Sequence, residues 1–189
     1  MKLENKKCNI FIEIDRNYKI GSADNYQYDL VLNPLNYIED YYDFKAIAIH
    51  IDCFYVEHHI AILSAWYPFY NTAILKEDKL TIMVNKSIIQ IDIMTGKIIK
   101  ANIVDFDMDM YEIIETKKGY LIHGEWKIVL LDFDFNLKWY FKGLDVFVAH
   151  GKPSFQLKED ENLICLYDFE DNYFEIDLDG NLIKEILAY

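Results

Sequence analysis

The sequence predicts an all-β protein made of antiparallel four-stranded repeat units, which form a small or partial β-propeller-like array. Three observations support this class. A phrase of apolar residue, Asp, polar turn and apolar run recurs along the chain, the 15 Tyr and 12 Phe favour pleated surfaces, and no long stretch shows a helical period. Hydrophobic residues form 52% of the 189, which is enough for a sizeable core and argues against disorder.

The recurring phrase is anchored on four aspartates. They are Asp15, Asp92, Asp132 and Asp177, which lie 77, 40 and 45 positions apart. Because the first gap is close to two of the others, we expect one more, degenerate copy between them, with two strands around Asp52. Four short strands in roughly 40 residues are typical of a propeller blade.

The spacing predicts one domain, residues 1–189, with an ordered set of parts. These are an N-terminal hairpin at 8–21, an acidic Tyr-rich insertion at 24–44, and repeat units at about 46–69, 71–104, 111–143 and 153–187. The chain is short for an ordinary closed propeller, so closed and open arrays both remain alternatives. An open array leaves sheet edges that must be covered or charged.

The aspartate turns have a structural explanation. Asp and Asn side chains accept hydrogen bonds from the backbone just ahead of them, and Gly96, Gly180 and Asn136 are expected to adopt positive φ near the tips. The run from Asp92 to Lys97, Asp-Ile-Met-Thr-Gly-Lys, resembles the turn of quinoprotein-type (PQQ-like) β-propeller repeats. The resemblance implies a fold and no cofactor, because no quinone-binding or metal-binding constellation accompanies it. The Trp that commonly follows this turn is present only at Trp139.

Charge narrows the class of partner. The formal charge is −13, residues 20–75 contain Lys45 as their only cation, and residues 159–183 contain nine acids without Lys or Arg. Nucleic acids and anionic membrane surfaces need cations on the protein, so both are disfavoured. A basic protein partner fits, because a negative field steers cationic proteins. The alternative is that acidity only maintains solubility.

The three cysteines have no paired spacing. Cys8, Cys53 and Cys165 are therefore expected to be reduced, buried thiols. The N-terminal stretch lacks an uninterrupted secretory core and no segment is long enough to span a membrane, so the expected location is the bacterial cytosol.

Motifs for metal binding or catalysis are missing. His50, Asp52, Glu57 and His59 form two strand-adjacent pairs, which are more consistent with ordinary strand residues than with a metal site. The acidic runs that begin at Asp105, Asp132 and Asp177 fail the glycine and glutamate positions of a calcium loop. The sequence also lacks a nucleophile elbow and a phosphate-binding loop.

Candidate partner-binding residues come from the insertion and from one acidic strip. Tyr supplies large contact area at low entropic cost, which suits a recognition surface. The alternatives are a loop packed on the rim of the fold and a solvated strand face. The candidates are Asp24, Tyr26, Tyr28, Asp29, Tyr37, Glu39, Asp40, Tyr41, Tyr42, Asp43, Asp105, Asp107 and Asp109.

The sequence thus favours a non-catalytic protein-binding module of the cytosol, such as an acidic immunity or inhibitor protein that binds a basic toxin. The alternative is a hydrolase with a carboxylate and histidine site in the central channel of the repeats, built around His50, His59 or His123. Pairing of copies through exposed sheet edges is a further alternative. No cofactor and no metal are expected.

Overall fold

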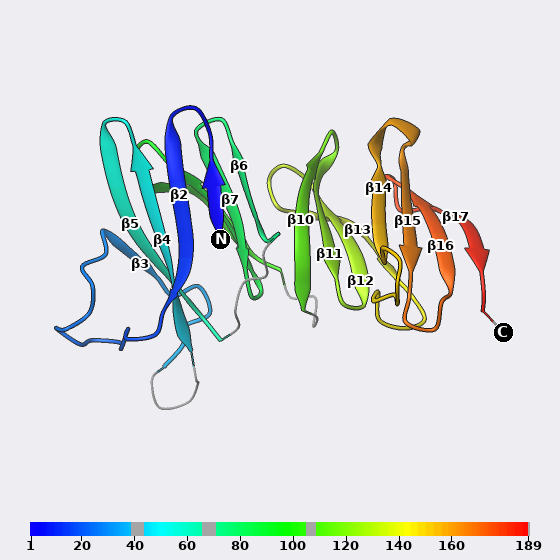
Figure 1. Cartoon of the computed structure of the whole chain (residues 1–189), viewed down its shortest axis with the longest axis horizontal. Helices are drawn as coiled ribbons and strands as arrows, with labels where there is room; N and C mark the ends of the chain where they lie inside the picture. The colour runs from blue at the N-terminus through cyan, green and yellow to red at the C-terminus, as the bar shows by residue number, and fades with distance from the viewer. Residues whose placement is uncertain (39–43, 66–70, 105–108, 189) are drawn as a thin grey trace. The chain divides into compact units, whose positions relative to one another are not determined.

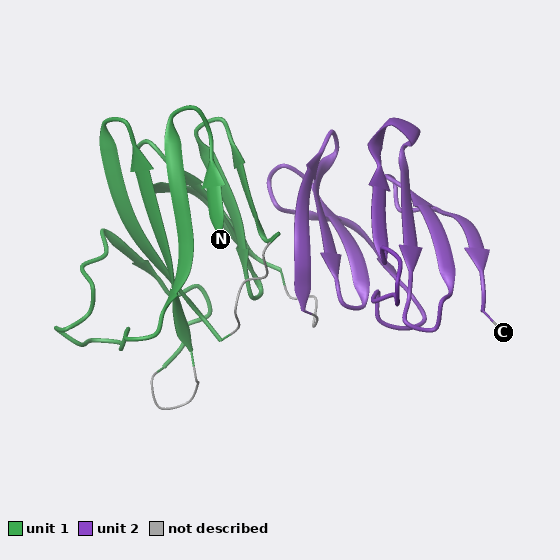
Figure 2. Cartoon of the chain, viewed as in Figure 1, with its two compact units in different colours: residues 1–106 green, residues 107–189 purple. Residues whose placement is uncertain are grey.

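The computed structural model describes residues 1–38, 44–65, 71–104 and 109–188 (Figure 1). The chain divides into two compact units, residues 1–106 and residues 107–189 (Figure 2). Each unit contains two sheets, in which all neighbouring strands are antiparallel except one pair in the first unit. In the described residues the only helix is a short 3-10 turn, Glu159–Glu161, and no helix there is long and apolar enough to cross a membrane.

The first unit begins with a five-stranded sheet in the order β1-β2-β4-β5-β3. Its last strand, β3, runs parallel to β5, and all other neighbours are antiparallel. The second sheet is a four-stranded meander in the order β6-β7-β8-β9. The strands are β1 (Lys2–Glu4), β2 (Cys8–Asp15), β3 (Leu30–Leu32), β4 (Lys45–Cys53), β5 (Val56–Ser64), β6 (Ala73–Lys76), β7 (Lys79–Val84), β8 (Ser87–Asp92) and β9 (Lys97–Ile103).

The second unit contains two four-stranded meanders, in the orders β10-β11-β12-β13 and β14-β15-β16-β17. The strands are β10 (Met110–Thr116), β11 (Gly119–Gly124), β12 (Lys127–Leu131), β13 (Leu137–Lys142), β14 (Phe155–Lys158), β15 (Leu163–Tyr167), β16 (Tyr173–Asp177) and β17 (Leu182–Ile186). The predicted all-β, propeller-like array of antiparallel four-stranded units is therefore confirmed, and the first sheet adds a fifth, parallel strand.

Apolar side chains that alternate along the strands form a core between the two sheets of each unit. In the first unit, Ile10, Ile49 and Ile60 of the first sheet belong to the same buried cluster as Ile82 and Ile91 of the second. In the second unit, Leu121, Leu130, Ile164, Phe174 and Ile176 form the corresponding cluster. Isoleucine suits these positions because its branched side chain packs well on a pleated surface.

The predicted N-terminal hairpin at 8–21 is wrong. β2 ends at Asp15 and pairs with β1 on one side and with β4 on the other, from Cys8 opposite Cys53 to Asp15 opposite Ala46. The side chain of Asp15 does form the expected local turn, because its Oδ1 accepts a hydrogen bond from the Asn17 N–H at 2.9 Å. Beyond this turn only Tyr18 and Ile20 continue the apolar alternation before Gly21, and both pack against the buried cluster around Tyr37 instead of forming a second hairpin strand.

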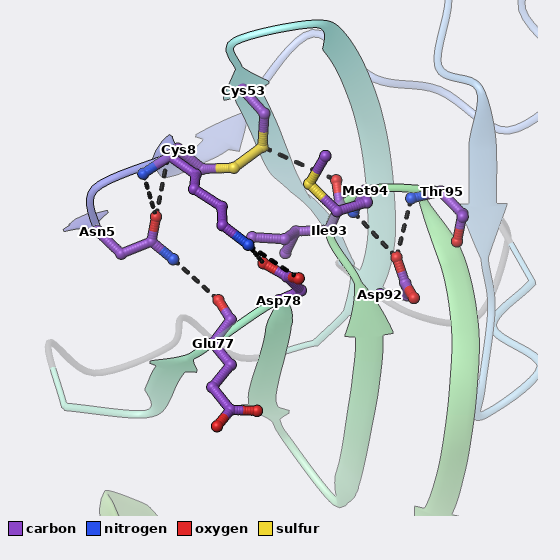
Figure 3. Close-up of polar contacts among 10 residues, drawn as sticks. Asn5, Cys8, Cys53, Glu77, Asp78, Asp92, Ile93, Met94 and Thr95 are labelled. Carbon is purple, nitrogen blue, oxygen red and sulfur yellow. Dashed lines mark hydrogen bonds and ion pairs between the residues drawn. A yellow bond between two sulfur atoms is a disulfide. The ribbon is translucent and has the colours of Figure 1, made fainter.

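The expectation of three reduced thiols is also wrong for two of them. Cys8 and Cys53 are joined by a disulfide between β2 and β4 (Figure 3). Cys165 is free and buried. The two bonded cysteines are 45 positions apart, and only the β2–β4 register places them opposite each other. Sequence spacing therefore gave no sign of the bond.

The turn that precedes Cys8 holds the two sheets of the first unit together. Asn5 Oδ1 accepts hydrogen bonds from the N–H groups of Lys7 and Cys8, and Asn5 Nδ2 donates to the Glu77 carbonyl at 2.9 Å (Figure 3). Lys7 Nζ lies 3.0 Å from Asp78 Oδ1. Glu77 and Asp78 form the β6–β7 turn, so this end of the first sheet is fixed to the second.

Candidate functional site

The candidate site is the side of the first sheet that faces away from the second sheet. We call this surface the aromatic–acidic face. Three strands contribute one row to it, because Phe11 of β2, His50 of β4 and His59 of β5 are directly opposite one another. The face consists of Phe11, Glu13, Asp15, Tyr26, Tyr28, Asp29, His50, Glu57 and His59.

The Tyr-rich insertion packs against the same side of the sheet, where the strands carry small residues. Ala46 and Ala61, together with Leu63, form a buried cluster with Tyr37. Tyr18, Tyr28, Ile20, Leu35 and Phe44 pack against this cluster. Alanine leaves room for the large rings, so part of the insertion is a structural cover and part remains available as surface.

Tyr37 belongs to the structural part. It is buried, and its backbone N–H and C=O both bond to the Asn33 side chain, at 2.8 and 2.9 Å. Its hydroxyl accepts a hydrogen bond from Asn85 Nδ2 at 2.7 Å. Tyr37 therefore fixes the loop in place and is not itself exposed to a partner.

Tyr28 links the insertion to the end of β2. Its hydroxyl donates to Asp15 Oδ2 at 2.9 Å. Partial burial, together with this hydrogen bond and the Asp15 charge, raises the pKa of Tyr28 above its ordinary value. Tyr28 therefore remains a neutral donor, and the Asp15 carboxylate is held on the face.

A pair of histidines lies at the centre of the face. Their Nδ1 atoms are 2.8 Å apart, so one ring donates a hydrogen bond and the other accepts it. The outward nitrogens lie near carboxylates: His50 Nε2 is 3.6 Å from Glu13 Oε1, and His59 Nε2 is 3.1 Å from Glu57 Oε1. Tyr26 meets both imidazoles edge-on, with centroid distances of 5.7 and 5.1 Å.

Asp29 brings the insertion and β5 together. Its Oδ2 accepts a hydrogen bond from the His59 backbone N–H at 2.7 Å, and its own N–H donates to the His59 carbonyl at 2.8 Å. Asp29 also lines an open cavity of about 400 Å³ with His58, Thr95, Gly96 and Lys97. The turn that resembles the quinoprotein repeat therefore lies beside the insertion.

The structure brings together only part of the predicted site. Tyr26, Tyr28 and Asp29 lie on the face, Asp24 is exposed nearby in sequence, and Asp109 belongs to the second unit. The other candidates lie outside the described residues: Glu39, Asp40, Tyr41, Tyr42, Asp43, Asp105 and Asp107.

The strand residues of the face were not predicted from the sequence as partner-binding residues. Phe11, Glu13 and Asp15 were not candidates, and His50, Glu57 and His59 were considered only for a metal or catalytic site. A signal existed for three of them, because Phe11, Glu13 and His50 alternate with isoleucines along β2 and β4. The described residues contain no group of three or more His, Cys, Asp or Glu side chains placed to hold a metal ion.

The aspartate turns of the second unit use their carboxylates internally. Asp132, Asp168 and Asp177 each accept hydrogen bonds through Oδ1 from the N–H groups two and four residues ahead, at 2.8–3.1 Å. An Asn four residues ahead donates from Nδ2 to Oδ2 of each Asp. These bonds lower the pKa of Asp132, with the Asn136 backbone as the largest cause. The copy at Asp168 was not predicted, although its Asp-x-x-x-Asn spacing was visible in the sequence.

The topology defines a class of protein: an all-β protein of blade-like sheets, whose first sheet carries the aromatic–acidic face. No family model matches the chain, and no curated protein sequence matches it. Solved structures do match, and the chain spans between 35% and 59% of the length of the three described below.

Three of the matching structures illustrate the similarity. BamB from Moraxella catarrhalis is 11% identical over 77% of this chain and 47% of its own, with a TM-score of 0.45. The dihydro-heme d1 dehydrogenase NirN in complex with DHE is 12% identical over 77% and 35%, with a TM-score of 0.48. Hsv2 from Kluyveromyces lactis is 9% identical over 76% and 59%, with a TM-score of 0.38.

Proposed function

We propose that this protein is a non-catalytic binding module that recognises a basic protein through the aromatic–acidic face. Immunity and inhibitor proteins that neutralise cationic toxins use this kind of chemistry. One observation carries the proposal: four carboxylates share one side of the first sheet with the exposed Tyr26. They belong to Glu13, Asp15, Asp29 and Glu57. Interfaces favour aromatic anchors, and an acidic rim speeds encounter with a cationic partner.

Charge reversal on the face tests this proposal. We would measure binding to a panel of purified cationic toxin domains by calorimetry, at low salt and at about 150 mM salt, where the screening length is near 8 Å. The variant Glu13→Lys/Glu57→Lys changes two exposed acids of the face. We expect at least tenfold weaker binding for this variant and a strong salt dependence for the unmodified protein.

A matched control carries the same type of charge change elsewhere. Glu185→Lys/Asp179→Lys alters two exposed acids of the second unit, so the net charge changes equally while the face stays intact. Equal losses for both variants would mean that only net charge matters. Absence of binding to every toxin domain at low ionic strength would refute the proposal.

The hydrolase alternative draws its support from the same histidine pair. His50 and His59 lie near Glu13 and Glu57, but on an open sheet face. Neither histidine lines the cavity beside Asp29 or a cavity of about 400 Å³ beside Pro34 and Ser87. His123 is buried in the second unit. Screening with chromogenic glycosides distinguishes the alternatives: turnover that His59→Ala abolishes would favour an enzyme.

The compartment is a separate part of the proposal. The sequence favours the cytosol, whereas disulfides such as Cys8–Cys53 persist mainly in oxidising compartments. Alkylation of intact cells followed by mass spectrometry would show whether the two thiols are bonded in the native location. Sedimentation of the purified protein would show whether copies associate.

A further inference from the structure

The hairpin between β4 and β5 ends in two exposed aromatic residues. Cys53 pairs with Val56, so Phe54 and Tyr55 alone form the loop, with exposed fractions of 75% and 91%. Two-residue hairpin loops favour Asn and Gly at positive φ, because such turns match the strand twist. Neither Phe54 nor Tyr55 has a positive φ. The loop therefore combines an unfavourable turn sequence with exposed apolar surface.

Other two-residue loops of this chain differ in composition. Glu77–Asp78, Asn85–Lys86 and Lys117–Lys118 close the β6–β7, β7–β8 and β10–β11 hairpins with polar residues. Two of these loops have a positive φ at their first residue. Of these four hairpin loops, only the β4–β5 loop carries a pair of aromatic residues.

A second unfavourable feature lies next to the loop. Asp52 and Glu57 are the next residue pair along the hairpin and are directly opposite each other, so both carboxylates project from the same face. Like charges directly opposite on neighbouring strands destabilise a sheet. Within the described part of the chain no Lys or Arg lies within ion-pair distance of Asp52. The Glu57 carboxylate has one charged neighbour there at ion-pair distance, the His59 ring.

The end of the hairpin is nevertheless fixed in position. Cys53, which precedes the loop, is bonded to Cys8, and the Phe54 N–H donates to the Lys7 carbonyl at 3.3 Å. Asn5 and Lys7 in turn connect this region to the β6–β7 turn (Figure 3). A protruding aromatic group on a pre-organised support loses little conformational entropy on binding.

We propose that Phe54 and Tyr55 insert into an apolar pocket of a basic protein, and that an Arg or Lys at the rim of this pocket binds between Asp52 and Glu57. This inference rests on the proposed function and names the contact that anchors it. The apolar pocket would cover the exposed rings, and a guanidinium would satisfy both carboxylates. A lipid bilayer fits less well, because its surface would bring the two carboxylates against anionic or zwitterionic head groups.

A displayed random peptide library, selected on the intact oxidised protein, tests this contact. We expect the enriched peptides to contain both an apolar cluster and at least one Arg or Lys. Calorimetry with the synthesised peptides should then show at least tenfold weaker binding to Phe54→Ser/Tyr55→Ser and to Asp52→Asn/Glu57→Gln. Leu144→Ser, which removes another exposed apolar side chain, should bind like the unmodified protein.

Folding of the variants is checked by thermal melts and by a second design, Phe54→Asn/Tyr55→Gly, whose turn sequence itself favours a hairpin. Enriched peptides without cations, peptides that bind all variants equally, or no enriched peptide at all would overturn the inference. Binding to phosphatidylcholine or phosphatidylserine vesicles that depends on Phe54 and Tyr55 would also overturn it. Salt-dependent toxin binding that the Phe54→Ser/Tyr55→Ser variant retains would leave the proposed function standing and reject only this contact.

Discussion

The imidazole of His58 packs directly on the turn glycine Gly96. The Cβ that any other residue would place at position 96 would lie 2.8 Å from His58 Cγ and Nδ1, and His58 Nε2 lies 3.2 Å from the Met94 carbonyl oxygen. In the second unit Trp139 has the same relationship to Gly180, and its Nε1–H donates to the Leu178 carbonyl at 3.3 Å. In each unit, a ring from the fourth strand of one sheet thus fixes the aspartate turn of the next sheet.

Gly96→Ala should therefore destabilise the protein beyond the cost of its backbone conformation alone. Gly96 has φ +65°, where an L-residue costs about 1–2 kcal/mol. The clash with His58 should add roughly 1–3 kcal/mol, because the ring cannot move without disturbing its packing. Urea titration measures the sum. Gly21→Ala is the matched control, since Gly21 has φ +73° and no atom lies within 4 Å of its added Cβ.

The second unit provides an independent repetition of this comparison. Gly180→Ala places a Cβ 2.7 Å from the Trp139 ring at φ +85°, whereas Gly151→Ala places one in open space at φ +71°. In each unit, the variant whose new Cβ meets a ring (Gly96→Ala or Gly180→Ala) should be less stable than the variant whose new Cβ lies in open space (Gly21→Ala or Gly151→Ala). Equal effects within a pair would show that the ring contact contributes nothing.

The regular part of this fold could be predicted from the sequence because its signals are local. Asp92, Asp132 and Asp177 marked the turns, since the hydrogen bonds of an aspartate turn involve only the next few residues. His58 could not be recognised as the counterpart of Trp139 in this way. Its role depends on a contact with residues 36 positions away.

The candidate site was only partly predictable for the same reason. The composition of the insertion indicated Tyr26 and Asp29 as surface residues. The contact between His50 and His59 depends on the β4–β5 register, and that of Tyr28 with Asp15 depends on how the insertion folds over the sheet. The parallel strand β3 is likewise too short, at three residues, to show a period in the sequence.

The Cys8–Cys53 disulfide should contribute substantially to the stability of the first unit. A closed loop of 45 residues loses entropy in the unfolded chain that corresponds to roughly 4 kcal/mol. We expect the urea midpoint to fall in the presence of a reductant and in Cys8→Ser/Cys53→Ser. Far-ultraviolet circular dichroism measures the transition.

Cys165 provides the control for reductant effects. Its thiol is free and buried, so Cys165→Ser should keep the full difference between oxidised and reduced protein. In a Trp66→Phe background, which removes the tryptophan of the first unit, Trp126 and Trp139 should report a transition of the second unit that reductant leaves unchanged. An unchanged circular dichroism midpoint after complete reduction would contradict the prediction.

His123 should make the stability of the second unit depend on pH. Burial lowers the pKa of His123 from 6.5 to about 4, and a hydrogen bond with the Phe147 backbone opposes this only partly. Because the folded pKa is depressed, the contribution of the neutral ring is fully present above pH 6.5 and is lost as the pH falls from there to about 4. The loss approaches about 3 kcal/mol, at 1.36 kcal/mol per pKa unit.

Urea titrations between pH 7.5 and 4.5 measure the slope of the free energy of unfolding against pH. In a Trp66→Phe background, the fluorescence of Trp126 and Trp139 follows the second unit. His123→Phe should reduce this slope, because the ring already stacks on Phe155 at 4.7 Å and a phenyl group can take its place without a charge. A slope that persists in His123→Phe would assign the pH dependence to other groups.

Asp168 should be the most important of the three aspartate turns in the second unit. It is fully buried, and its carboxylate accepts hydrogen bonds from the N–H groups of Glu170 and Asn172 and from Asn172 Nδ2. Asp168→Ala would leave the two Asn172 donors unpaired in the interior, and buried unsatisfied groups cost about 1–3 kcal/mol each. Asp132→Ala removes the same bonds at the surface, where water replaces them. We therefore expect Asp168→Ala to lower the urea midpoint of the second unit much further than Asp132→Ala does, and equal midpoints would show that burial does not set the strength of this turn.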